Sequence, residues 1–222
     1  MDSLLTPSSP DPGTYLNILW EDQDLMVIHK SAGMHSVQGS TVEKIDSVQF
    51  RVQLRYREAM MAHRLDRSTS GIIIAALNKP CLSGLHRQFE KRTVEKNYIA
   101  VVDGIMAEDT GEIELPICCD WPNRPRQMVC YETGKASMTR YRVLERNIAE
   151  NTTRVLLMPV TGRTHQLRVH MNELNHPILG CNFYKNEGSE GRASRLLLHA
   201  SMIKFQHPMT GETLTIECPP EF

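Results

Sequence analysis

The sequence predicts an α+β fold in which helices and loops flank a mixed, mainly antiparallel central sheet. Three observations support this prediction. Strand-like apolar runs form hairpins near both ends of the chain, and helical apolar spacing occurs in three segments between them. The 222 residues, 41% of them hydrophobic, can bury one sizeable core, so a single domain over 15–222 is the simpler expectation.

The N-terminal part predicts a hairpin followed by a helix. Residues 1–14 are rich in Ser and Pro and are expected to be a disordered tail. Strand-like runs at 16–20 and 25–29 flank the acidic turn 21–24. Asp46 is a candidate N-cap for a helix whose apolar face extends to Ala59.

A buried strand is predicted at the centre of the N-terminal half. Residues 72–77 form an apolar run rich in β-branched residues and too short for an independent helix. Leu82, Leu85 and Phe89 then recur at helical spacing, and residues 93–102 alternate as a strand does.

The second half predicts further strands around one helix. Residues 116–135 carry Pro and Arg and are expected to be irregular, and strands are expected at 139–144 and 154–158. Apolar spacing after Thr164 predicts a helix that ends near Asn175. Two more runs, 203–206 and 213–217, predict a closing hairpin.

Composition argues against several classes of protein. The net charge of −1 argues against nucleic-acid binding through bulk charge, although basic and acidic residues are segregated along the chain. The six cysteines have no zinc-ligand spacing, so we expect them to be reduced and no metal to be bound. No apolar stretch of about 18 residues occurs, and we expect a cytoplasmic protein without a membrane span.

Asp66 is the candidate catalytic residue that chemistry alone suggests. It lies between Arg64 and Arg67 in a polar loop just before the buried strand 72–77. A guanidinium can keep such a carboxylate ionised at the edge of a core, which makes it a candidate nucleophile. The alternative is an ordinary turn, in which Asp66 bonds nearby backbone N–H groups or takes part in a surface ion pair.

Several ordered motifs bear on this choice. They are His63-Arg64-Leu65-Asp66 with Thr69-Ser70-Gly71, Lys96-Asn97-Tyr98-Ile99-Ala100, Gly162-Arg163-Thr164-His165-Gln166-Leu167-Arg168, His176-Pro177-Ile178-Leu179-Gly180 and Leu196-Leu197-Leu198-His199-Ala200. Together they resemble the signature of the RluA-type pseudouridine synthases over roughly residues 16 to 220. Ser31 stands where family members usually carry Pro.

The resemblance implies a role for five residues. It implies that Asp66 is the catalytic carboxylate and that Arg168 is its ion-pair partner, a better candidate than Arg67. It also implies that Tyr98 stacks on the target base and is placed for proton transfer. Arg64 would fill the place of the flipped base, and Leu198 would form an apolar wall of the uracil slot. Without the resemblance, Tyr98 would be read as a half-buried packing residue and Arg168 as a solvated one.

Substrate selection is expected to come from the catalytic domain itself, through Arg87, Arg92, Arg124 and Arg126. Residues 116–135 allow two interpretations that the sequence leaves equal. They form either a surface loop held by a buried Trp121 or an RNA-gripping loop, with arginines on phosphates and Trp121 free to stack.

The implied function is isomerisation of uridine to pseudouridine in RNA, after the base is flipped out of its stack. Residues 119–125 and 130–135 are similar to one branch of the family, which implies a tRNA anticodon stem-loop and 23S rRNA as targets. We expect a monomer that binds RNA and not DNA, and the reaction needs no cofactor. The alternatives are a noncatalytic RNA-binding protein on the same scaffold and a glycoside hydrolase, which would require a second carboxylate beside Asp66.

Overall fold

The computed structural model describes residues 16–39, 46–186 and 191–222, so the predicted tail at 1–14 lies outside the described residues. Ten strands form one sheet in the order β1-β2-β4-β11-β5-β10-β9-β6, with β12 beside β11 and β3 beside β4. These strands are β1 (Asn17–Glu21), β2 (Leu25–Lys30), β3 (Met60–Met61), β4 (Ser70–Ala76), β5 (Glu95–Asp103), β6 (Thr110–Glu114), β9 (Met138–Asn147), β10 (Thr152–Pro159), β11 (Leu198–Gln206) and β12 (Thr213–Glu217).

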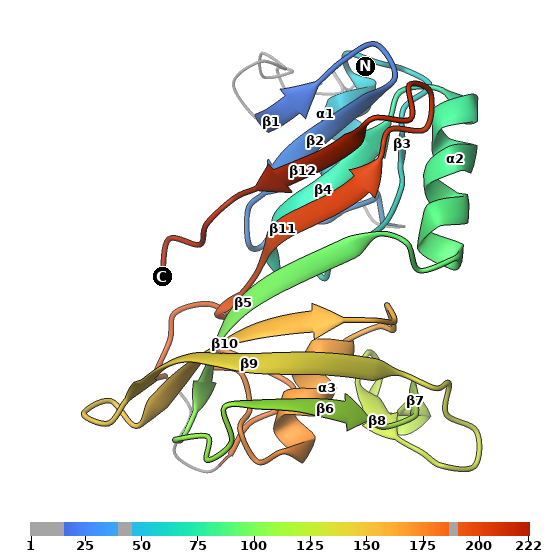
Figure 1. Cartoon of the computed structure of the whole chain (residues 1–222). Helices are drawn as coiled ribbons and strands as arrows, with labels where there is room; N and C mark the ends of the chain where they lie inside the picture. The colour runs from blue at the N-terminus through green and yellow to red at the C-terminus, as the bar shows by residue number, and fades with distance from the viewer. Residues whose placement is uncertain (1–15, 40–45, 187–190) are drawn as a thin grey trace, which may run out of the picture.

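The remaining elements cover this sheet or extend from it. They are α1 (Val48–Gln53), α2 (Lys79–Glu90), α3 (Gln166–Glu173), the 3-10 helix η3 (Trp121–Asn123), and the hairpin strands β7 (Ile117–Cys119) and β8 (Gln127–Val129). Figure 1 shows α2 beside the N-terminal half of the sheet, while α3 and the β7–β8 hairpin lie with the other half. We call β1, β2, β3, β4, β11 and β12 the N-terminal half of the sheet, and β5, β6, β9 and β10 the other half. The two halves meet where β11 pairs with β5.

The sheet is mixed and mainly antiparallel, as predicted. Among the described strands, only the pairing of β11 with β4 is parallel, through His199 with Ser70 and Ala200 with Gly71. Gly71 has a φ of +111°, and a Cβ there would lie 2.3 Å from the backbone oxygen of Ala200. Only glycine permits this close approach of the two strands, so the sequence Ser70-Gly71 fixes where β4 meets β11.

Apolar side chains form separate clusters in the two halves. In the N-terminal half, β2 and β4 are buried on both faces, and Leu25, Ile72 and Ile73 are almost inaccessible. In the other half, β5, β10 and α3 pack together around residues such as Leu157 and Met171. Burying each such side chain contributes roughly 1.5–3 kcal/mol, so each half holds its strands firmly.

Several expectations need correction. The N-cap of α1 is Ser47, whose hydroxyl accepts from the Phe50 N–H, and the helix ends at Gln53 well before Ala59. Asp46 instead pairs with Arg51 at 2.7 Å. Strand β11 begins at Leu198, five residues before the expected start at 203, because it continues alongside β5.

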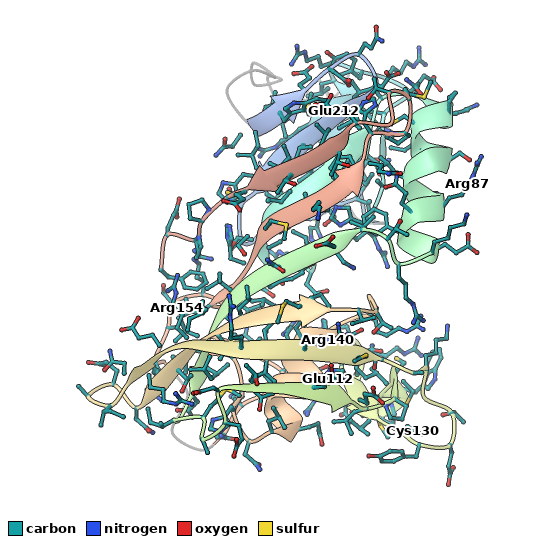
Figure 2. All side chains as sticks on the ribbon, in the orientation of Figure 1. Arg87, Glu112, Cys130, Arg140, Arg154 and Glu212 are labelled. Atoms are coloured by element: carbon teal, nitrogen blue, oxygen red, sulfur yellow. The ribbon has the colours of Figure 1, made fainter. Side chains whose placement is uncertain are left out.

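The other corrections concern 110–135. Strand β6 was not predicted. It is held by antiparallel pairing with β9, and Glu112 and Arg140 form an ion pair at 2.7 Å across the two strands (Figure 2). Residues expected to be irregular include the short strands β7 and β8. Trp121 is 66% exposed, which excludes the interpretation of a loop held by a buried tryptophan.

Candidate active site

The loop that carries Asp66 is held by the end of β2. Lys30 is almost completely buried, and its Nζ donates to the backbone oxygens of Ser31, Met34 and Arg67 at 3.0, 2.9 and 3.2 Å. Burial lowers the pKa of Lys30 to about 8, against the raising effect of the Asp66 charge. An ammonium thus cross-links the segment after β2 to the segment after Asp66.

A second clamp lies on the other side of Asp66. The Ser36 hydroxyl donates to the Leu65 oxygen at 2.7 Å and accepts from the Leu65 N–H at 3.0 Å. Arg67 points away from Asp66, since its Nε donates to the Gly33 oxygen at 2.9 Å. The backbone on both sides of Asp66 is therefore fixed, and Arg67 is not its ion-pair partner.

Arg168 lies against Asp66 although the two are 102 residues apart in sequence. Its Nη1 donates to Asp66 Oδ2 at 3.3 Å, and its Nε and Nη2 each lie 3.3 Å from Cys181 Sγ. The guanidinium also lies 5.2 Å and 5.5 Å from the ring centres of Phe183 and Tyr184. Arg168 is only 3% exposed, so a solvated role for it is excluded.

His165 is a second basic neighbour of Asp66, and sequence reasoning gave it no role. Its Nε2 lies 3.7 Å from Asp66 Oδ2, and its Nδ1 lies 3.0 Å from the Tyr184 hydroxyl. Burial lowers the pKa of His165, Asp66 raises it and Arg168 lowers it, with burial the largest effect. The sequence feature that could have identified His165 is its place in the Gly162–Arg168 motif. In the structure it lies directly before α3 and has a left-handed φ of 54°.

The turn before α3 is shaped by Gln166, another residue that sequence reasoning did not single out. Its side-chain oxygen accepts from the Thr161 hydroxyl at 2.7 Å and from the Arg163 N–H at 3.0 Å. The helix therefore begins at Gln166 rather than at Thr164. This arrangement places His165 and Arg168 on the side of α3 that faces Asp66.

Asp66 opens into a small slot inside a larger groove. The slot encloses about 100 Å³, and Arg64, Asp66, Tyr98, Arg168 and Leu198 are among its lining residues. The groove encloses about 1070 Å³ and extends from Gly162 and Arg163 towards Arg92 and the C-terminal end of α2. The slot thus brings together five residues from four distant segments of the chain.

Tyr98 and Leu198 form the less charged side of the slot. Tyr98 lies on β5, and burial together with the Asp66 charge raises the pKa of its phenol. The phenol consequently stays protonated at neutral pH. Leu198 is 3% exposed at the start of β11.

Residues expected to bind RNA lie at varied distances from the slot. Arg92 lines the groove, whereas Arg87 points outward from α2 (Figure 2) and lies 3.4 Å from the Ser83 hydroxyl. Arg124 stacks over the exposed Trp121 at 4.1 Å, and Arg126 lies 5.6 Å from the Tyr184 ring. Between β7 and β8, Pro125 is the described residue that lines the groove.

Two clusters of potential metal ligands occur among the described residues, away from the slot. In the first, His29, His199 and Cys218 approach one another, but both nitrogens of His199 are engaged, by the Ser70 hydroxyl and the Cys218 oxygen at 2.9 Å each. In the second, His207 Nδ1 accepts two backbone N–H bonds, so Nε2 carries the proton and faces Asp22 Oδ2 at 2.9 Å. Hydrogen bonds within the protein thus engage both ring nitrogens of His199, and His207 is engaged by backbone N–H groups at Nδ1 and by the Asp22 carboxylate beside Nε2.

Comparison with known proteins gives consistent matches. The sequence profile of the RNA pseudouridylate synthase family matches residues 24–173. Dual-specificity RNA pseudouridine synthase RluA from Escherichia coli strain K12 is 48% identical over 214 residues, 96% of this chain and 97% of the relative. The protein of the same name from Yersinia pestis is 48% identical over 205 residues, 92% and 99% of the two chains.

A solved structure agrees with these sequence matches. Human RNA Pseudouridylate Synthase Domain Containing 1 superposes with a TM-score of 0.78 at 29% identity, covering 96% of this chain and 87% of that one. None of the helices in the described part of the chain has the length and apolar composition of a membrane span.

Proposed function

The chain belongs to the RNA pseudouridylate synthase family, and on that premise we propose that Asp66 is the carboxylate with which it isomerises uridine in RNA. The observation that carries this proposal is the contact of Asp66 with the buried Arg168 inside a slot that Tyr98 also lines. The Arg168 guanidinium is thus a positively charged counter-ion placed directly beside the carboxylate.

The reaction breaks the C–N glycosidic bond, turns the uracil and joins its carbon to the same ribose carbon. Asp66 acts either at the ribose anomeric carbon, as glycosidase carboxylates do, or on the uracil ring. No oxidation or group donor is involved, so the reaction requires no cofactor. Tyr98, which remains protonated, stacks on the uracil and is placed for proton transfer.

The target base must leave the RNA stack to reach Asp66, which costs a few kcal/mol. Stacking on an aromatic ring contributes about 1–3 kcal/mol per base, so Tyr98 offsets much of this cost. Arg64 is exposed at the slot and fills the vacated place in the stack, while Leu198 forms an apolar wall against the uracil.

We further propose tRNA anticodon stem-loops and 23S rRNA as substrates, bound by the protein as a monomer in the cytoplasm. Dual-specificity RNA relatives at 48% identity support two RNA targets. Arg87, Arg92, Arg124 and Arg126 contact phosphates, and Trp121 stacks on an unpaired base.

A noncatalytic RNA-binding protein is the alternative, and substitution of Asp66 separates the two. Asp66→Asn should keep RNA binding within a few-fold and abolish product. Tritium release from RNA labelled at uracil C5 reports product, because binding alone cannot free that hydrogen. Turnover by the Asn variant would refute the role of Asp66, and no release by the wild type would favour the alternative.

A glycoside hydrolase is disfavoured by the composition of the slot. Asp66 is the one carboxylate among the described residues that line it, whereas hydrolysis by the usual route needs two. Free uracil among the products would reverse this judgement.

A further inference from the structure

Lys96 lies where the slot opens into the groove, and no function described above uses it. It lines both cavities. It precedes Tyr98 by two residues on β5, so the two side chains leave the same face of the strand, about 6.6 Å apart along it. A strand in the middle of the sheet gives Lys96 a fixed position beside the ring proposed to stack on the base.

The charge of Lys96 has no anionic partner within the described residues. Its Nζ makes no hydrogen bond or ion pair there, and it lies over the Phe89 ring, 5.8 Å from the centre. Burial lowers the pKa of Lys96, which reflects the penalty for keeping this cation in a partly dry position.

Lys204 provides a contrast on the neighbouring strand. Its Nζ donates to Glu95 Oε1 at 3.0 Å, and it lines neither the slot nor the groove. The two lysines lie at adjacent register positions of the β11–β5 pair, opposite Ile203 and Glu95. One cation has its anion in the folded protein, and the other faces the substrate groove without one.

We propose that Lys96 binds the phosphodiester adjacent to the flipped uridine, an inference that rests on the proposed function. When the base lies against Tyr98, its ribose-phosphate must leave the slot at the mouth, where Lys96 lies. Asp66 is already compensated by Arg168, so a phosphate is the anion best able to complete the Lys96 site. Glu90 also lines the groove and limits the excess of positive charge at its outer end.

Lys96→Met tests this site, with Lys204→Met as the matched control. Methionine places an unbranched apolar side chain beside Phe89 and removes the buried charge, so the thermal midpoint should not fall. Each phosphate contact contributes about 0.7 to the slope of log Kd against log salt for single strands. The loss of affinity between 50 and 200 mM KCl should therefore be about threefold smaller for Lys96→Met than for the wild type and for Lys204→Met.

Methylphosphonate linkages, which are uncharged, identify the phosphate that Lys96 contacts. The target uridine of a stem-loop is first mapped with the wild type. The phosphodiester link on its 5′ side, and in a second RNA the link on its 3′ side, is then replaced by a methylphosphonate. One link should weaken wild-type binding and cause no further loss in Lys96→Met. Additive losses at both links, or a salt slope equal to that of Lys204→Met, would overturn the Lys96 site. Tritium release by the wild type tests the proposed function separately.

Discussion

At the scale of single residues, Asp66 has two basic neighbours, but only Arg168 is charged near neutral pH. Burial lowers the pKa of His165, so its ring is neutral there and contributes no net charge to the slot. A guanidinium group carries its positive charge throughout the accessible pH range. Cys181 and two aromatic rings fix the orientation of the Arg168 guanidinium. The ion pair with Asp66 therefore depends on a partner that cannot titrate away.

Lys30, beneath the same loop, does titrate, and it gives folding stability a predictable pH dependence. Its pKa is about 8 when folded and near 10.5 when exposed, so between these values the unfolded chain binds more protons. Stability from this group therefore rises with pH over that interval. The unfolding free energy of the wild type relative to Lys30→Met should increase by at most about 3 kcal/mol between pH 8 and 10.5.

Chemical denaturation of both proteins at each pH measures this difference and cancels the other titrating groups. A difference that stays constant or falls across the interval would show that Lys30 is not a buried cation.

At the scale of elements, the β7–β8 hairpin presents an aromatic surface that the core does not use. Trp121 is 66% exposed, and Arg124 covers one face of it. The other face is available to an unpaired base. Trp121→Ala should raise the Kd for a stem-loop about tenfold, within the usual 1–3 kcal/mol for a stacked base, and Trp121→Phe should recover most of the affinity.

The stability of these variants should stay within about 0.5 kcal/mol of the wild type, since Trp121 is largely exposed. Tyr131→Ala is the control, because Tyr131 is an aromatic residue as exposed as Trp121, at 78%, and has no proposed contact with RNA. Equal losses of RNA affinity in Trp121→Ala and Tyr131→Ala would contradict a specific stacking role for Trp121 and point to a general effect of exposed aromatic residues.

Local pattern was enough to predict most elements. The burial of β4 followed from its run of β-branched residues, and α2 followed from the spacing of Leu82, Leu85 and Phe89. Strands β3, β6, β7 and β8 were missed, because each is held by pairing with a strand that single-sequence patterns do not identify as its partner. The N-cap at Ser47 was missed by one residue, since Asp46 is an equally good capping type.

At the scale of the whole molecule, the slot forms where the two halves of the sheet meet. Asp66 comes from the N-terminal half, and Arg168 comes from α3 in the other half. Their separation of 102 positions in sequence leaves no local signal of this contact, so only the family resemblance suggested it. The places of His165, Cys181 and Lys96 likewise depend on how the halves meet, which explains why residue patterns alone gave them no role.

The whole chain is almost neutral, with 25 Lys and Arg against 26 Asp and Glu, yet its groove is not. The described lining residues include five Lys or Arg, namely Arg64, Arg67, Arg92, Lys96 and Arg163, but only the carboxylates of Asp66 and Glu90. RNA affinity therefore depends on locally placed basic residues, those of this groove among them, rather than on net charge. A stem-loop with an unpaired uridine should bind at least about tenfold more tightly than a duplex of equal length, because only the stem-loop can place a base on Tyr98 without breaking a pair.

Filter binding at several KCl concentrations measures both affinities. Since the two RNAs carry similar backbone charge, the preference should persist as salt increases; a preference that disappears at high salt would mean that the slot adds no affinity beyond the phosphate contacts.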